Sequence, residues 1–128
     1  MPSRAKKAPL VKLASRFRIF WKGEIALGPG KVDLLRAIRQ TGSIRQAASQ
    51  LDMSYMRAWL LIRTMNRCFK EPLVNAARGG SEHGGATLTP TGLSALKLYE
   101  QLEAESLAAT LRTRRELQKL LNPLPSRG

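Results

Sequence analysis

The stretch that most constrains the fold is GSIRQAASQLDMSYMRAWLLIRTMNR, residues 42–67, where two helical patterns follow one another with almost no chain between them. In the first pattern, the apolar residues recur at the spacing of one helix face and predict its inner side, namely Ile44, Ala47, Ala48 and Leu51. Ser43 precedes this pattern as a candidate N-cap. Because the two alanines are small, they allow a neighbouring helix to approach closely. Helices joined this tightly must cross at a steep angle.

The second pattern begins with polar, aromatic and cationic residues. Asp52-Met53 forms the expected turn, and Ser54 is a second candidate N-cap. Asp52 stands where glycine is common in such turns, and aspartate is among the few other residues that tolerate a positive φ. The apolar positions of this helix lie three or four residues apart and predict its buried face. They are Ala58, Leu61, Ile62 and Met65.

The segments on either side predict a hairpin, a further helix and a second hairpin. RFRIFWKGEIAL, residues 16–27, alternates like a strand and offers a turn at Lys22-Gly23. After GPG at 28–30, an amphipathic helix is expected over 31–40, with Gly42 well placed to end it. LVNAAR and ATLT then flank GGSEHGG, which predicts a hairpin with a glycine-rich tip.

Thr89-Pro90 starts a long C-terminal helix with an expected cap and first residue. Its apolar stripe extends toward residue 121, before Pro123. A stripe this long exceeds what a small domain can cover, so we expect a second copy of the chain to pack on it. The alternative is a helix that breaks near Ser106 and folds back. The expected dimer contacts are Leu96, Tyr99, Leu102, Leu107 and Trp21.

The chain is strongly basic, with 22 Lys and Arg against 9 Asp and Glu and a formal net charge of +13 over 128 residues. A small domain with this balance usually meets a polyanion. Residues 1–23 contain no acid; we interpret the first 15 as a flexible basic arm, with a transit peptide as the alternative. No apolar run approaches the length of a membrane span, so we expect no membrane partner and a cytoplasmic, nucleoid-associated location.

Together these signals predict a mainly α fold with small β elements, a winged helix-turn-helix. The expected organisation is the arm at 1–15, the winged domain at 16–89, a dimerisation helix at 90–121 and a disordered tail at 122–128. The second helix of the pair would lie in the major groove of double-stranded DNA with its N-terminal residues at base edges. The expected DNA contacts are Ser43, Arg45, Ser54, Tyr55, Met56, Arg57, Trp59, Arg63, Arg78, Lys6 and Lys7.

Among these residues, two kinds of contact are expected. Arg57 projects from the first turns of an anchored helix, so we expect it to read a base edge. Lys6 and Lys7 have no fixed frame and are expected to contact phosphates alone.

Residues 24 to about 105 resemble the N-terminal DNA-binding domain of the ModE family, the molybdate-responsive transcription regulators with a LysR-like winged helix. The resemblance is carried by TGSIRQAASQLDMSYMRAWLLIRTMN, PLVNAARGG and GGATLTPTGLSALKLYEQLE, most specifically by SYMRAW and by the glycine-rich wing before LTPTG. It implies a dimeric, operator-binding transcription factor in which residues 54–57 face DNA. Full-length members resemble this chain only in part, because they add a C-terminal molybdate-binding pair of small β-barrels. We therefore expect a stand-alone form that does not bind molybdate directly.

The residues that could carry catalysis are few. The single histidine, His83, lies in the glycine-rich tip, and the single cysteine, Cys68, follows the apolar face of the second helix. Neither has a partner that the sequence reveals, so we expect no enzyme, no cofactor and no metal site. The alternative function is a nonspecific architectural DNA- or RNA-binding protein that uses its winged helix as a basic wedge.

Overall fold

The structure is a computed structural model that describes residues 11–76 and 85–126. A short hairpin comes first, formed by β1 (Ile19–Trp21) and β2 (Glu24–Leu27) in antiparallel pairing. The predicted turn between them is confirmed: Lys22 and Gly23 have φ values of 49° and 79°, as a tight two-residue hairpin turn requires. All three residues of β1 are exposed, whereas β2 ends in the buried Ala26 and Leu27.

Helix α1 (Pro29–Thr41) is the centre of the core. It begins two residues earlier than predicted, with Pro29 at a first-turn position where no backbone N–H is needed. Gly42 ends it as predicted, in the left-handed conformation at φ 70°, and its N–H donates to the carbonyl oxygen of Ile38 at 2.8 Å. The fully buried residues of α1 are Val32, Leu34, Leu35, Ala37 and Ile38.

The crossed pair that the sequence predicted is formed by α2 (Ile44–Gln50) and α3 (Tyr55–Cys68). Both predicted caps are present, because Ser43 Oγ accepts from the N–H of Gln46 at 3.1 Å and Ser54 Oγ accepts from that of Arg57 at 3.0 Å. Between the helices, Asp52 has a φ of 55°, so it occupies the left-handed turn position expected of it. Ala47 and Ala48 of α2 and Ala58 of α3 are buried in the core.

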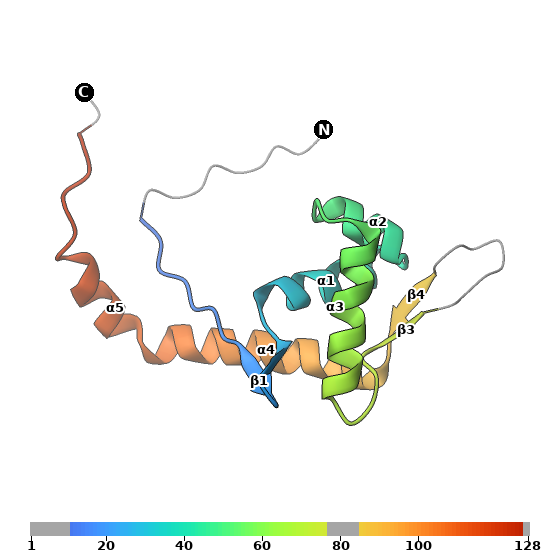
Figure 1. The fold of residues 1–128 in the computed structure, drawn as a ribbon. Coiled ribbons are helices and arrows are strands. Elements are labelled where there is room, and N and C mark those ends of the chain that lie inside the picture. Colours follow the sequence, from blue (N-terminus) through green and yellow to red (C-terminus); the bar gives the residue numbers. More distant parts are fainter. Residues whose placement is uncertain (1–10, 77–84, 127–128) are drawn as a thin grey trace.

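The wing consists of β3 (Val74–Ala76) and β4 (Ala86–Leu88), paired antiparallel as predicted. It is joined to the helices at two places. Gly85 bridges Ser43, and the Ala86 N–H donates to the Gly42 carbonyl oxygen at 2.9 Å. In Figure 1 the wing extends beside α3, on the side away from the N-terminal hairpin.

Helix α4 (Pro90–Ala109) runs beneath the other helices and continues beyond them, as Figure 1 shows. Thr89 caps it as predicted, accepting from the Gly92 N–H at 2.9 Å. The predicted C-terminal helix is not continuous to residue 121. It is interrupted at Thr110, before α5 (Leu111–Gln118) begins. Figure 1 shows α5 leading away from the domain, not folding back along α4.

The first turn of α4 packs directly on the backbone that leads into the wing. A Cβ added at Gly92 would lie 2.1 Å from the Leu73 carbonyl oxygen. That oxygen already accepts from the Thr89 N–H at 2.9 Å, so it cannot move away without losing a hydrogen bond. The close approach therefore requires glycine.

We predict that Gly92→Ala destabilises the fold by about 1–3 kcal/mol, because the added methyl forces two backbone segments apart. Gly30→Ala is the matched control, since a Cβ at Gly30 in the first turn of α1 meets nothing within 4 Å and alanine favours helix. Urea denaturation followed by circular dichroism measures both. Equal stabilities for the two variants would contradict the close packing of Gly92 on Leu73.

Candidate nucleic-acid interface

The exposed surface of α3 is set by the packing of its opposite face. Ala58, Ile62 and Met65 are buried in the core. Helix geometry then places Met56, Leu60 and Arg63 on the outer side, and all three are exposed, Met56 at 66% and Leu60 at 50%. A ridge with two large apolar groups and an arginine faces outward beside the wing. We call Met56, Leu60 and Arg63 the outer ridge of α3.

Aromatic contacts fix the flank of α3 that faces α2. The guanidinium of Arg45 lies over the ring of Tyr55, 4.8 Å from its centroid. Trp59 meets Tyr55 edge-on, with ring centroids 6.2 Å apart. Tyr55 and Trp59 are both half-buried. Stacking of this kind limits the freedom of the arginine, so this flank presents a positioned cation.

The two cap serines lie at the starts of α2 and α3, where the sequence placed possible DNA contacts. Each hydroxyl oxygen already accepts a backbone N–H within its own helix. The hydroxyl hydrogen of Ser43 and of Ser54 can still donate outward. Capping and an outward hydrogen bond are therefore compatible at both positions.

The opposite flank of α3 faces α1 and carries Arg57. Its side chain lines a pocket of about 250 Å³ together with Arg18 and Lys31. The pKa of Lys31 is lowered from its ordinary value by burial and by the positive charge of Arg57, while Cys68 and Glu24 act in the opposite direction. Neither Arg18 nor Lys31 was predicted as a contact from the sequence, because nothing in their local patterns indicates that they meet Arg57.

The Asn66 side chain joins α3 to the start of the wing. Its Oδ1 accepts from the N–H groups of Leu73 at 2.8 Å and Val74 at 3.2 Å, and its Nδ2 donates to the Val74 carbonyl oxygen at 3.1 Å. The orientation of the wing relative to α3 depends on these bonds. Three sequence-predicted contacts, Arg78 near the wing tip and Lys6 and Lys7 in the arm, lie outside the described residues.

The residues expected at a dimer contact divide into two groups. Leu96 and Tyr99 are buried in the chain's own core, and the Tyr99 hydroxyl donates to the Phe17 carbonyl oxygen at 2.8 Å. They therefore fill the domain instead of presenting a surface to a partner. Leu102, Leu107 and Trp21 are exposed. Three exposed residues nearby were not selected from the sequence, namely Ile19, Phe20 and Leu98.

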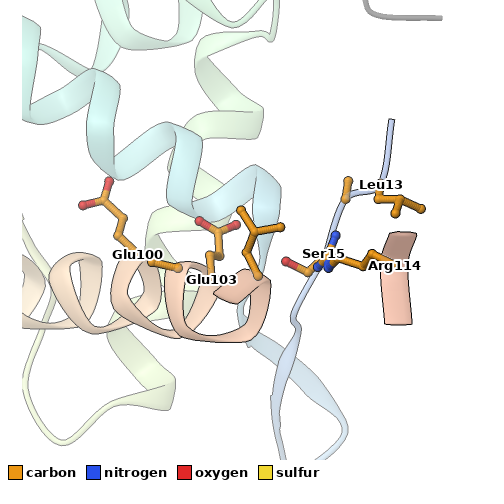
Figure 2. Close-up of a pocket in the computed structure, with 8 residues that line it drawn as sticks. Leu13, Ser15, Glu100, Glu103 and Arg114 are labelled. Carbon is orange, nitrogen blue, oxygen red and sulfur yellow. The ribbon is translucent and has the colours of Figure 1, made fainter. Parts of the chain in front are cut away.

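A second pocket, of about 410 Å³, lies between the chain before β1 and the helices α4 and α5. Figure 2 shows Glu100 and Glu103 along α4 on one side and Leu13, Ser15 and Arg114 on the other. Both glutamates already pair with Arg36, at 2.8 Å and 3.8 Å. No residue of α3 or the wing lines this pocket, so it is separate from the exposed face of α3.

Other site types find little support in the described part of the chain. Within residues 11–76 and 85–126, no group of three or more His, Cys, Asp or Glu side chains is placed to hold a metal ion. No helix in the same ranges is long and apolar enough to cross a membrane. Cys68 is a free, half-buried thiol at the end of α3.

A known family model matches the part of the chain that contains the helix pair, the wing and the first turn of α4. Residues 30–93 match the profile described as bacterial regulatory helix-turn-helix protein, lysR family. The chain belongs to this family. The matched range includes α1 from its second residue, α2, α3 and both strands of the wing, so it contains the outer ridge of α3 and both of its flanks.

Relatives of this lysR-family chain include two proteins with molybdenum in their names and a DNA-binding regulator. The chain is 44% identical over 78 residues to the molybdenum-pterin-binding protein MopB of Rhodobacter capsulatus. The aligned segment covers 61% of this chain and 29% of that protein. The chain is 39% identical over 95 residues to the molybdenum transport protein ModE of Azotobacter vinelandii, covering 74% and 35%. The DNA-binding transcriptional dual regulator ModE of Escherichia coli is 40% identical over 74 residues, covering 58% and 28%.

The ModE resemblance that the sequence motifs indicated is thus confirmed by similarity to these proteins. The chain spans about a third of the length of the curated relatives that it matches.

We predict that Asn66→Ala lowers the free energy of unfolding by about 1–3 kcal/mol, because it leaves the backbone groups of Leu73 and Val74 without their partner. Asn75→Ala is the matched control: Asn75 is exposed in β3, and the change should stay within about 0.5 kcal/mol. Amide hydrogen exchange should show loss of protection at Leu73 and Val74 in the first variant alone. Unchanged protection at both amides would contradict the role given to Asn66.

Proposed function

We propose that this chain is a sequence-specific transcription regulator of the ModE type that binds double-stranded DNA as a dimer. The observation that carries the proposal is the outer ridge of α3, formed by Met56, Leu60 and Arg63 on the face opposite the buried Ala58, Ile62 and Met65. A helix presented in this way fits the major groove, which is about 12 Å wide. The formal charge of +13 supports a polyanionic partner.

The roles of the α3 residues follow from their positions. Arg63 and Met56 point away from the core and are assigned to base edges. Arginine can donate two hydrogen bonds to guanine, and apolar groups contact the thymine methyl. Ser43, Arg45 and Ser54 lie at helix starts beside α3 and are assigned to phosphates. Tyr55, which Trp59 meets edge-on, holds the Arg45 side chain. Lys6, Lys7 and Arg78 would add phosphate contacts from the arm and the wing.

Dimerisation is proposed through the exposed apolar side of α4. Leu98 and Leu102 are four residues apart and exposed at 61% and 38%, which places them on one side of the helix. Phe17 joins the N-terminal hairpin to α4 through Tyr99, and the adjoining β1 exposes Trp21. A second copy packed on this side would bring two α3 helices to half-sites about 34 Å apart, or a multiple of that spacing.

The alternative function is a nonspecific DNA- or RNA-binding protein. The ratio of the affinity for the best DNA sequence to the affinity for random DNA distinguishes it from a sequence-specific regulator. Selection of bound fragments from genomic DNA, followed by titration at fixed salt, gives the affinity for the best sequence and for random DNA. The proposal expects a ratio of about 10³ or more and a pseudo-palindromic sequence. A ratio near unity would overturn the regulator and favour the nonspecific binder.

We predict that Leu102→Asp converts the dimer to a monomer, because it buries a carboxylate in an apolar contact. Gln101→Asp is the matched control: it adds the same charge one residue away, on another side of α4. Sedimentation equilibrium at micromolar concentration measures both. A wild-type chain that is already monomeric, or a Leu102→Asp variant that remains dimeric, would refute this interface.

We predict that Arg63→Ala weakens binding to the selected sequence by about 1–3 kcal/mol and changes binding to random DNA much less. Removal of residues 1–8 should instead weaken both DNAs alike and reduce the salt slope by up to about 0.9 for each lost phosphate contact. Fluorescence titrations over a salt series compare the two variants. Equal losses on both DNAs for Arg63→Ala would assign Arg63 to a phosphate.

A further inference from the structure

Three cations from three different elements meet in the pocket beside α3. Arg18 comes from the chain just before β1, Lys31 from the first turns of α1 and Arg57 from the first turn of α3. No carboxylate lines the pocket, whose volume is about 250 Å³. The space is large enough for a phosphate group and its nearest water molecules. We call it the α1–α3 pocket.

The pocket is built by close packing of the backbone and not by chance exposure of long side chains. A Cβ added at the buried Gly28 would lie 3.3 Å from Cγ of Arg18, so the stem of Arg18 lies along the start of α1. Met53 and Leu61 close the α3 side of the pocket. The stem of Arg18 is therefore positioned by packing, and Lys31 is partly buried.

The positive charges are not balanced within the described residues. No salt bridge there involves Arg18, Lys31 or Arg57, and the carboxylate of Glu24, which also acts on Lys31, is paired with Arg67. Arg57 lowers the pKa of Lys31, which is itself partly buried. Because like charges held together repel, an anion that enters the pocket gains from all three groups.

The pocket also lies where a DNA phosphate would be. An α-helix with its side chains is about 10–12 Å wide and nearly fills a major groove about 12 Å wide. The phosphates that border the groove therefore lie along the two flanks of the inserted helix. The α1–α3 pocket opens on one of these flanks, sharing Arg57 and Leu61 with α3.

We propose that the α1–α3 pocket binds one backbone phosphate of the DNA, held by Arg18, Lys31 and Arg57. The inference rests on the proposed function, because it requires α3 in the major groove. It adds Arg18 and Lys31 to the interface and assigns Arg57 to the backbone, not to the base edge expected from the sequence. Base reading is then left to the outer ridge of α3.

The test replaces single backbone phosphates of the selected DNA by neutral methylphosphonates and measures binding to the wild type, Lys31→Gln and Arg18→Gln. Lys97→Gln is the control, because it removes the same charge from an exposed position on α4. Circular dichroism confirms that each variant is folded. For the wild type, one backbone position bordering each half-site should lower the affinity by roughly 10-fold or more when neutralised.

For Lys31→Gln and Arg18→Gln, neutralisation at that same position should have a smaller effect than for the wild type, because one of the three cations that hold this phosphate is already lost. Each variant should also weaken selected and random DNA equally and lower the salt slope by about 0.9. Lys97→Gln should keep the wild-type pattern. Lys31→Gln and Arg18→Gln variants that retain full sensitivity at every backbone position would overturn the proposal.

Calorimetry with inorganic phosphate, without DNA, tests a free oxyanion as the occupant of the pocket. Saturable binding that Lys31→Gln abolishes, together with no effect of any methylphosphonate, would overturn a DNA phosphate in favour of a free one. If no sequence is selected over random DNA, the proposed regulator fails, but the salt slopes of Lys31→Gln and Lys97→Gln on random DNA still decide whether the pocket holds a phosphate.

Discussion

The contact between α2 and α3 through small residues determines what this chain can present to a partner. α2 packs against both α1 and α3, and the residues that α2 and α3 bury include the small Ala47, Ala48 and Ala58. The turn between them is short because Asp52 adopts a positive φ, at a cost on the order of 1 kcal/mol. Burial of one face of α3 fixes the opposite face outward. The outer ridge is thus a consequence of packing on the other side of the same helix.

Hydrogen bonds fix the position of the wing relative to α3, which apolar packing alone would not do. Asn66 bonds to the backbone at Leu73 and Val74, and the close approach of Gly92 to Leu73 holds the same segment from α4. On the other strand, the Ala86 N–H is bonded to Gly42. Both strands of the wing are therefore tied to ends of the helices that support α3, so the wing and the outer ridge keep one relative orientation.

The fold was largely predictable from the sequence because its signals are local. The caps at Ser43, Ser54 and Thr89 and the turn at Lys22-Gly23 depend on neighbouring residues alone, and all are present. Which surface an apolar stripe packs against does not depend on neighbouring residues alone. Leu96 and Tyr99 have the spacing of a dimer face but are buried in the core of their own chain. Likewise, the meeting of Arg18, Lys31 and Arg57 depends on how three distant segments pack, which no pattern within one segment records.

Charged side chains are paired between α1 and α4 but are mostly unpaired around the exposed face of α3. Arg36 pairs with Asp33, Glu100 and Glu103 between α1 and α4, so three of the nine acids in the chain are used there. In the part of the chain that the structure describes, Arg18, Lys31, Arg45, Arg57 and Arg63 form no salt bridge. Arg67, near the end of α3, is paired with Glu24, but the cations on and beside the first turns of α3 are left unpaired. The exposed face of α3 therefore lies among positive charges that an anionic partner can neutralise.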